Sequence, residues 1–108
     1  ILTSLNISKM TFGEYIRKLR EQKHLLLREV ASQMDTDTAL LSKIERGTRK
    51  ARKEQVEALA TALNENKIEL IKIWMADKIV DMIMYETNSE EILKIAEEKI
   101  KKLTNQNE

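Results

Sequence analysis

The chain has 108 residues, a formal net charge of +1 and 42% hydrophobic residues. It has no cysteine, no proline and few aromatic residues, which excludes a disulfide framework and a thiolate metal site and favours an all-helical protein packed with aliphatic side chains. No uninterrupted apolar stretch approaches the length of a membrane span or a signal peptide core, so the sequence predicts a cytoplasmic protein that makes no membrane contact.

The charge is divided unequally along the chain. Residues 1–53 carry 12 Lys and Arg against 6 Asp and Glu, whereas residues 54–108 carry 7 against 12. Clusters of Lys and Arg attract polyanions because each phosphate that they neutralise releases counterions. The first half is therefore the half suited to nucleic acid.

The first helix is predicted to start after Thr11. Thr11 and Glu14 have the spacing of a capping box, in which each side chain accepts a hydrogen bond from the backbone N–H of the other. Apolar residues then recur with the period of one helix face over about three turns. They are Phe12, Tyr15, Ile16 and Leu19. Residues 1–10 precede this pattern, and we expect them to be an N-terminal arm or an expression remnant.

Two short helices joined by a tight turn are predicted next. The apolar residues of the first are Leu27, Val30, Ala31 and Met34. The turn follows at residues 35–37, where Asp37 is the expected N-cap of the second helix and Gly47 its left-handed terminator. Two helices of about two turns separated by about three residues have the geometry of a helix-turn-helix, whose second helix lies in the major groove. Apolar spacing predicts a further helix that ends near Leu63.

The order and spacing of these segments resemble the XRE family, the Cro and repressor type of bacterial and phage transcription regulators. The resemblance covers residues 11–63. The family often carries Gly, Gln and Pro where His24, Leu27 and Ala51 stand here. The matching segments are Leu19-Arg20, Glu29-Val30-Ala31, Leu41-Ser42-Lys43-Ile44-Glu45-Arg46-Gly47, and Leu59-Ala60 with Leu63.

This resemblance implies a fold and a function. The fold is all-α, with a five-helix repressor-like DNA-binding domain at residues 11–66 and C-terminal helices for dimerisation at residues 67–108. The function is that of a sequence-specific transcriptional regulator, a dimer that represses by occupying a pseudo-palindromic operator. In the phage repressors, an arginine of the first helix pairs with a glutamate near the end of the recognition helix. The matching residues are Arg20 and Glu45, and we expect this ion pair to be partly buried.

The recognition helix supplies the candidates for base reading. Residues near the start of such a helix point into the groove. Lys43 would donate to guanine O6 and N7, and Thr38 and Ala39 would touch a thymine methyl. Ser42 completes the set, although the alternative for Thr38 and Ser42 is contact with phosphate or water alone.

A basic cluster after the recognition helix supplies the candidates for phosphate binding. A loop at this place would run beside the DNA backbone. The alternative is a solvated basic loop without a partner. The residues are Arg46, Arg49, Lys50, Arg52 and Lys53.

The last part of the chain has more apolar surface than one small domain can bury. Among the 18 residues from Ile68 to Tyr85, 13 are apolar, and they fall on nearly every side of a helix. A partner helix is the expected cover. We predict a homodimer with Trp74, Ile79 and Ile83 in its interface. A final helix is expected from Ser89 to Leu103, with an apolar seam of Leu93, Ala96, Ile100 and Leu103.

Nothing in the sequence favours an enzyme, a cofactor or a metal site. His24 is the only histidine, it stands at a turn, and two glycines cannot build a phosphate-cradling loop. The expected partners are double-stranded DNA and a second copy of the chain. The alternative function is a protein-interaction module, such as an antitoxin-like partner, that binds another protein through the apolar C-terminal half. Within the regulators, a restriction-modification controller and a phage repressor stay equally open.

Overall fold

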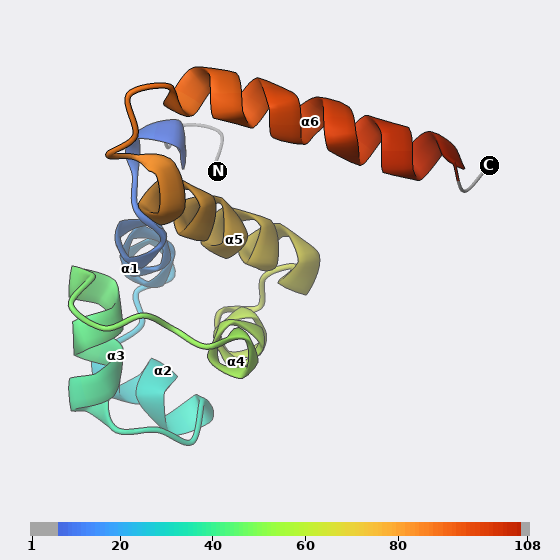
Figure 1. The fold of residues 1–108 in the computed structure, drawn as a ribbon. Helices are drawn as coiled ribbons and strands as arrows, with labels where there is room; N and C mark the ends of the chain where they lie inside the picture. The colour runs from blue at the N-terminus through green and yellow to red at the C-terminus, as the bar shows by residue number, and fades with distance from the viewer. Residues whose placement is uncertain (1–6, 107–108) are drawn as a thin grey trace. The chain divides into compact units, whose positions relative to one another are not determined.

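The computed structural model describes residues 7–106, which contain helices and no strand. The all-α prediction is confirmed, and the helices begin and end close to the residues predicted. In chain order they are the 3-10 helix η2 (Ile7–Lys9) and the α-helices α1 (Phe12–Gln22), α2 (Leu27–Gln33), α3 (Thr38–Arg46), α4 (Lys53–Leu63), α5 (Lys67–Ile83) and α6 (Ser89–Gln106) (Figure 1).

Local sequence sets where α1 and α3 begin and where α3 ends. The capping box predicted at α1 is present, since the Glu14 N–H donates to Thr11 Oγ1 at 3.1 Å and the Thr11 N–H donates to Glu14 Oε1 at 2.9 Å. At α3, Asp37 accepts a hydrogen bond from the Leu40 N–H. Gly47 ends α3 with φ +80°, a left-handed conformation that costs glycine little. Each of these groups satisfies a backbone donor or acceptor that the helix itself leaves unpaired.

The chain divides into two compact units, Ile1–Asp77 and Lys78–Glu108. In the first unit, α1 to α4 surround one apolar core with the first part of α5 (Figure 1). Leu70 and Trp74 of α5 belong to this core, with 1% and 7% of their surface exposed. The first unit ends at Asp77 and thus extends beyond the boundary that we predicted after residue 66, because Leu70 and Trp74, one helical turn apart, are both buried against the preceding helices.

The second unit comprises the end of α5 and the whole of α6. None of residues 89–105 of α6 is buried, and its large apolar side chains are 37–63% exposed. They include the seam residues Leu93, Ile100 and Leu103. Among residues 7–106, no helix combines the length and the apolar character that a membrane crossing requires.

Candidate nucleic-acid interface

The helix-turn-helix is formed by α2 and α3. Val30 and Ala31 of α2 and Leu41 and Ile44 of α3 are buried in the shared core, each with at most 2% of its surface exposed. With these faces turned inward, the opposite face of α3 is left to solvent. The turn between the helices contains Asp35, a non-glycine residue with φ +57°, and aspartate tolerates this conformation better than most residues do.

The outward face of α3 carries the residues that were predicted to read bases. Thr38, Ala39 and Lys43 are exposed, and Ser42 is half-buried. Leu40, in contrast, packs against the core as a partly buried side chain. One helix face therefore presents a hydroxyl, a methyl and an ammonium group, which are the chemical types that distinguish base edges in the major groove.

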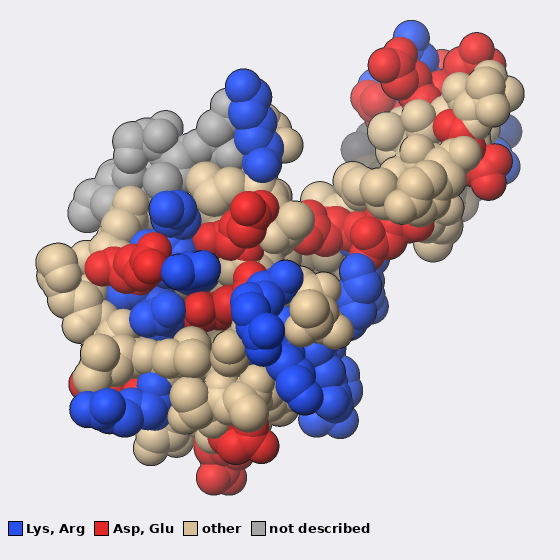
Figure 2. All heavy atoms as spheres, turned by 90° about the vertical axis from the view of Figure 1, so that its left-hand side faces the viewer, with Lys and Arg blue, Asp and Glu red and all other residues tan. Residues whose placement is uncertain are grey.

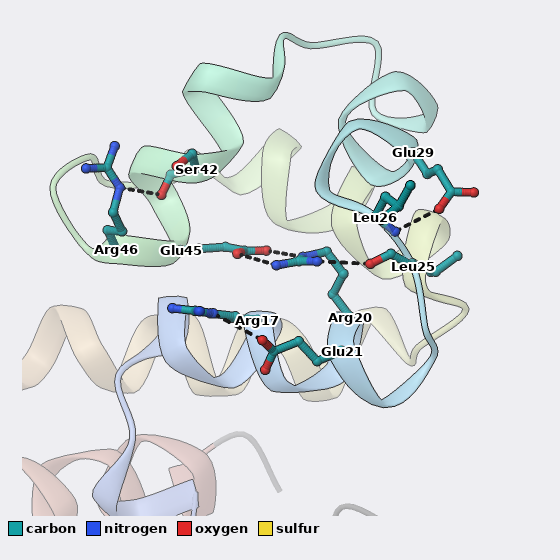
Figure 3. A network of polar contacts seen from close by, with 9 residues as sticks. All are labelled: Arg17, Arg20, Glu21, Leu25, Leu26, Glu29, Ser42, Glu45 and Arg46. Carbon is teal, nitrogen blue, oxygen red and sulfur yellow. Dashed lines mark hydrogen bonds and ion pairs between the residues drawn. The ribbon is translucent and has the colours of Figure 1, made fainter.

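Arg20 and Glu45 point toward one another between α1 and α3 (Figure 3). Arg20 Nε donates to Glu45 Oε2 at 2.8 Å and Arg20 Nη2 donates to Glu45 Oε1 at 3.1 Å, while Nη1 donates to the Leu25 carbonyl at 2.9 Å. The two side chains are 14% and 7% exposed. The hydrogen bonds with Glu45 raise the pKa of Arg20, against the effect of its burial. The pair joins α1 to the C-terminal turn of α3, with a third bond to the segment before α2.

Two more arginines surround this pair at the surface. Arg17 forms an exposed ion pair with Glu21 one turn further along α1. Arg46 Nε donates to the Ser42 carbonyl at 3.3 Å, so its side chain lies back along α3 (Figure 3). Arg46 is exposed, and its cationic group is therefore available on the same helix as the candidate base readers.

The remaining candidate phosphate ligands lie in the segment between α3 and α4 and at the start of α4. Arg49, Lys50, Arg52 and Lys53 are all exposed, whereas Ala51 between them is only 6% exposed. We refer to residues 49–53 as the basic loop. Figure 2 looks onto the side of the molecule that carries α3 and shows Lys and Arg side chains gathered there, with several acidic side chains between them. The predicted base-reading and phosphate-binding residues thus lie in consecutive segments, α3 and the basic loop.

The three residues predicted for a dimer interface have different surroundings. Ile79 is 45% exposed and Ile83 is half-buried, so both retain apolar surface. The assignment of Trp74 to this interface is wrong. Its side chain is only 7% exposed, and its Nε1 donates to the Ala51 carbonyl at 2.9 Å inside the first unit. The sequence pattern placed Trp74 among surplus apolar residues because the apolar positions of α5 surround the helix, and only the packing shows which of them face the core.

Two structural contacts behind the interface were missed by the sequence reasoning. A Cβ on Gly13 of α1 would meet the carbonyl oxygens of Ile44 and Glu45 at the end of α3. The Phe12 N–H at the start of α1 donates to Asp77 Oδ2 at 2.6 Å, across 65 residues of sequence. A glycine inside a predicted helix was the one available signal for the first contact, since glycine in such a place often marks a close approach of two backbones. No sequence signal pointed to Asp77.

An open polar hollow of about 690 Å³ lies at the turn of the helix-turn-helix. The part of the chain that the structure describes contains no cluster of His, Cys, Asp and Glu able to hold a metal ion. The hollow is lined by Arg28, Ser32, Asp35, Thr36, Asp37 and Thr38. Its mixed charges and open shape are those of a surface depression beside α3 rather than of an enclosed small-molecule pocket.

Comparison with known proteins agrees with this geometry. The model of a family described as "helix-turn-helix domain" matches residues 11–69, more than half of the chain. The restriction-modification controller protein C.AhdI from Aeromonas hydrophila is 34% identical, with a TM-score of 0.53 over 55% of this chain and 89% of that one. The clp gene regulator ClgR from C. glutamicum is 24% identical and shares the fold, with a TM-score of 0.54 over 61% of this chain and 86% of that one. Curated proteins gave no match.

The chain belongs to this helix-turn-helix domain family. The resemblance read from the sequence is confirmed at this level. The family consists of DNA-binding rather than catalytic domains, in agreement with the prediction that the chain is not an enzyme.

Proposed function

Starting from this family membership, we propose that the protein is a sequence-specific transcriptional regulator, which binds a pseudo-palindromic operator as a homodimer and represses by occupying a promoter. The observation that carries the proposal is the exposed face of α3. Thr38, Ala39 and Lys43 stand outward on a helix that the Arg20–Glu45 pair fixes from behind. A rigid helix with varied polar groups on its free face suits reading of the major groove.

The basic loop supports the proposal through electrostatics. Exposed cations beside a recognition helix bind phosphates, which positions the helix on the duplex without carrying sequence information. Arg46 and the four cations of the basic loop would serve this role. If each protomer neutralises about three phosphates and the dimer about six, log K against log salt has a slope near −5.

The dimer is supported by apolar surface outside the core of the first unit. Ile79, Val80 and Met82 at the end of α5 are 45%, 52% and 78% exposed, and exposed apolar side chains that gather on one element often mark a site of contact with a partner. We assign Ile79 and Ile83 to the interface. Two-fold symmetry would then present two recognition helices to half-sites about 34 Å apart, one turn of the duplex.

The similarity to C.AhdI supports a regulator of the restriction-modification controller type. The match covers 89% of the length of C.AhdI. In this chain, α6 follows the family match, which ends at residue 69.

The test is selection of duplexes from a random library, followed by sedimentation of the protein with the selected duplex. We expect a sequence with two related half-sites and a complex of two protomers per duplex. Selection without any enriched sequence would contradict sequence-specific regulation. A single unrepeated half-site bound by one protomer would contradict the dimer alone.

The second candidate function is a protein-interaction module of the antitoxin-like kind. It is favoured by α6, whose apolar seam lies exposed along a helix of 18 residues. In this case the protein would form a stoichiometric complex with a different protein, and Ile100→Glu would abolish that complex while leaving DNA affinity unchanged. Loss of self-association in Ile100→Glu would instead assign α6 to the homodimer.

A further inference from the structure

Trp74 is the link between α5 and the middle of the basic loop. Its indole Nε1 donates to the carbonyl oxygen of Ala51 at 2.9 Å, and the bond is buried. Both side chains belong to the apolar core, with Ala51 6% and Trp74 7% exposed. The loop therefore contacts the core at its central residue, while Lys50 and Arg52 on either side of that residue are exposed.

Backbone hydrogen bonds also hold the two ends of this segment. At the start, the Thr48 and Arg49 N–H groups donate to the Lys43 carbonyl at 3.0 and 3.3 Å. At the end, the Arg52 N–H donates to Gln55 Oε1 at 2.8 Å. The Trp74 bond fixes the backbone between these ends, and it comes from a helix 23 residues further along the chain.

We propose that Trp74 is a positioning residue for DNA binding, because it holds the basic loop in the conformation that presents its cations to the phosphate backbone. This inference rests on the proposed function. A buried carbonyl that loses its donor must find another partner, and the nearest available one is water. The Ala51 backbone would then move outward, and its flanking cations would sample many positions instead of one. Contacts to phosphate would be lost, but the recognition helix would keep its place.

This role gives a specific signature in DNA binding. Trp74→Phe keeps a large apolar ring in the core and removes only the N–H donor. We expect about fivefold weaker binding per half-site, the equivalent of one ordinary hydrogen bond, with the same loss for specific and nonspecific duplexes. The magnitude of the slope of log K against log salt should decrease by about 1 for each protomer that loses one phosphate contact. The ratio of specific to nonspecific affinity should not change.

The matched control is Leu63→Val, at the far end of α4 from the basic loop. Leu63 is 1% exposed, so its truncation also weakens the core, yet it leaves the Trp74–Ala51 bond intact. Both variants are compared with the wild type by fluorescence anisotropy, at temperatures where all three are folded. A reduced slope in Trp74→Phe with an unchanged slope in Leu63→Val supports the proposal. An unchanged slope in both, or an equal reduction in both, overturns it.

A second measurement needs no variant. The chain has one tryptophan, so its indole N–H gives a single, assignable NMR signal. If Trp74 holds a loop that DNA contacts, saturating duplex should slow exchange of the indole proton with solvent, and an unchanged exchange rate contradicts the inference. A wild-type protein that binds no duplex at any salt concentration would instead refute the proposed function itself.

Discussion

Arg20 of α1 and Glu45 of α3 form a bidentate ion pair that is largely buried. Two nitrogens of the guanidinium meet the two carboxylate oxygens at 2.8 and 3.1 Å. Glu45 is the buried charged residue of the described core, and its charge is balanced by a residue 25 positions earlier in the sequence. The placement of the recognition helix thus depends on a charge carried by another helix.

Breaking this pair should destabilise the protein. Arg20→Met leaves the Glu45 carboxylate buried without its cation, which costs about 3 kcal/mol of unfolding free energy. Glu45→Gln should cost less, since the amide oxygen still accepts one hydrogen bond. Urea unfolding measures both, and the control is Arg17→Met, whose exposed pair with Glu21 is worth at most about 1 kcal/mol. Equal midpoints for Arg20→Met and Arg17→Met would contradict a structural role for the buried pair.

Gly13→Ala should destabilise the protein although it lies inside α1. In an unobstructed helix, alanine is more favourable than glycine by about 1 kcal/mol. Here a Cβ would meet the carbonyl oxygens of Ile44 and Glu45, so α1 and α3 must move apart. We expect a lower melting temperature together with weaker DNA binding.

The control is Gly47→Ala. A Cβ at this position would have no other atom within 4 Å, but the backbone has φ +80°. That substitution should cost about 1 kcal/mol through backbone strain alone. It should leave the contact between α1 and α3 unchanged. A Gly13→Ala protein as stable as the wild type would show that the two helices tolerate a wider separation.

Lys43→Ala should relax sequence preference at one base pair of each half-site. The lysine is exposed on the outward face of α3, and a good base contact provides about 1 to 3 kcal/mol of discrimination. The measurement is the affinity for a set of operators, each with one substituted base pair. If Lys43→Ala weakens every duplex by the same factor, Lys43 contacts phosphate and not a base.

Arg49→Ala should weaken specific and nonspecific duplexes alike. Loss of one phosphate contact per half-site reduces the dimer's salt slope by about 2. Lys72→Ala is the matched control, because Lys72 is an exposed cation paired with Glu69 on α5 and outside the basic loop. A salt titration of all three proteins by fluorescence anisotropy decides the matter. A wild-type slope near zero would mean that the basic loop does not meet DNA.

Ile79→Glu should dissociate the proposed dimer. A carboxylate at an apolar interface is costly to desolvate, and Ile79 is 45% exposed within the chain, so the monomer should stay folded. Sedimentation equilibrium should give a monomer that binds one half-site weakly. Thr61→Glu, on the exposed side of α4, is the control and should remain a dimer.

A dimeric Ile79→Glu protein would place the interface elsewhere. Truncation after residue 64 is a poorer test, because it removes Leu70 and Trp74 from the core.

The sequence by itself determined the features that depend on neighbours along the chain. The helices begin at polar caps such as Thr11 and Asp37 and end at residues such as Gly47, because capping is local chemistry between residues about three positions apart. The outward face of α3 followed from the same helical period, since burying Leu41 and Ile44 leaves Thr38, Ala39 and Lys43 outside. The Arg20–Glu45 pairing came from the family resemblance, which carries tertiary information that periodicity lacks.

Only the tertiary structure decided the role of residues whose partners are far away in sequence. The apolar positions of α5 surround the helix, so periodicity alone assigned Trp74 to a partner surface, whereas its indole is buried against Ala51. The partners of Gly13 and Asp77 likewise came only from the structure, because they lie on α3 and at the start of α1, although a glycine inside a predicted helix gave a hint of the first contact. The helical period determines which residues share a face. Which face meets the core depends on how helices that are distant in sequence pack together. That packing determined both the extent of the first unit and the attachment of the basic loop to the core.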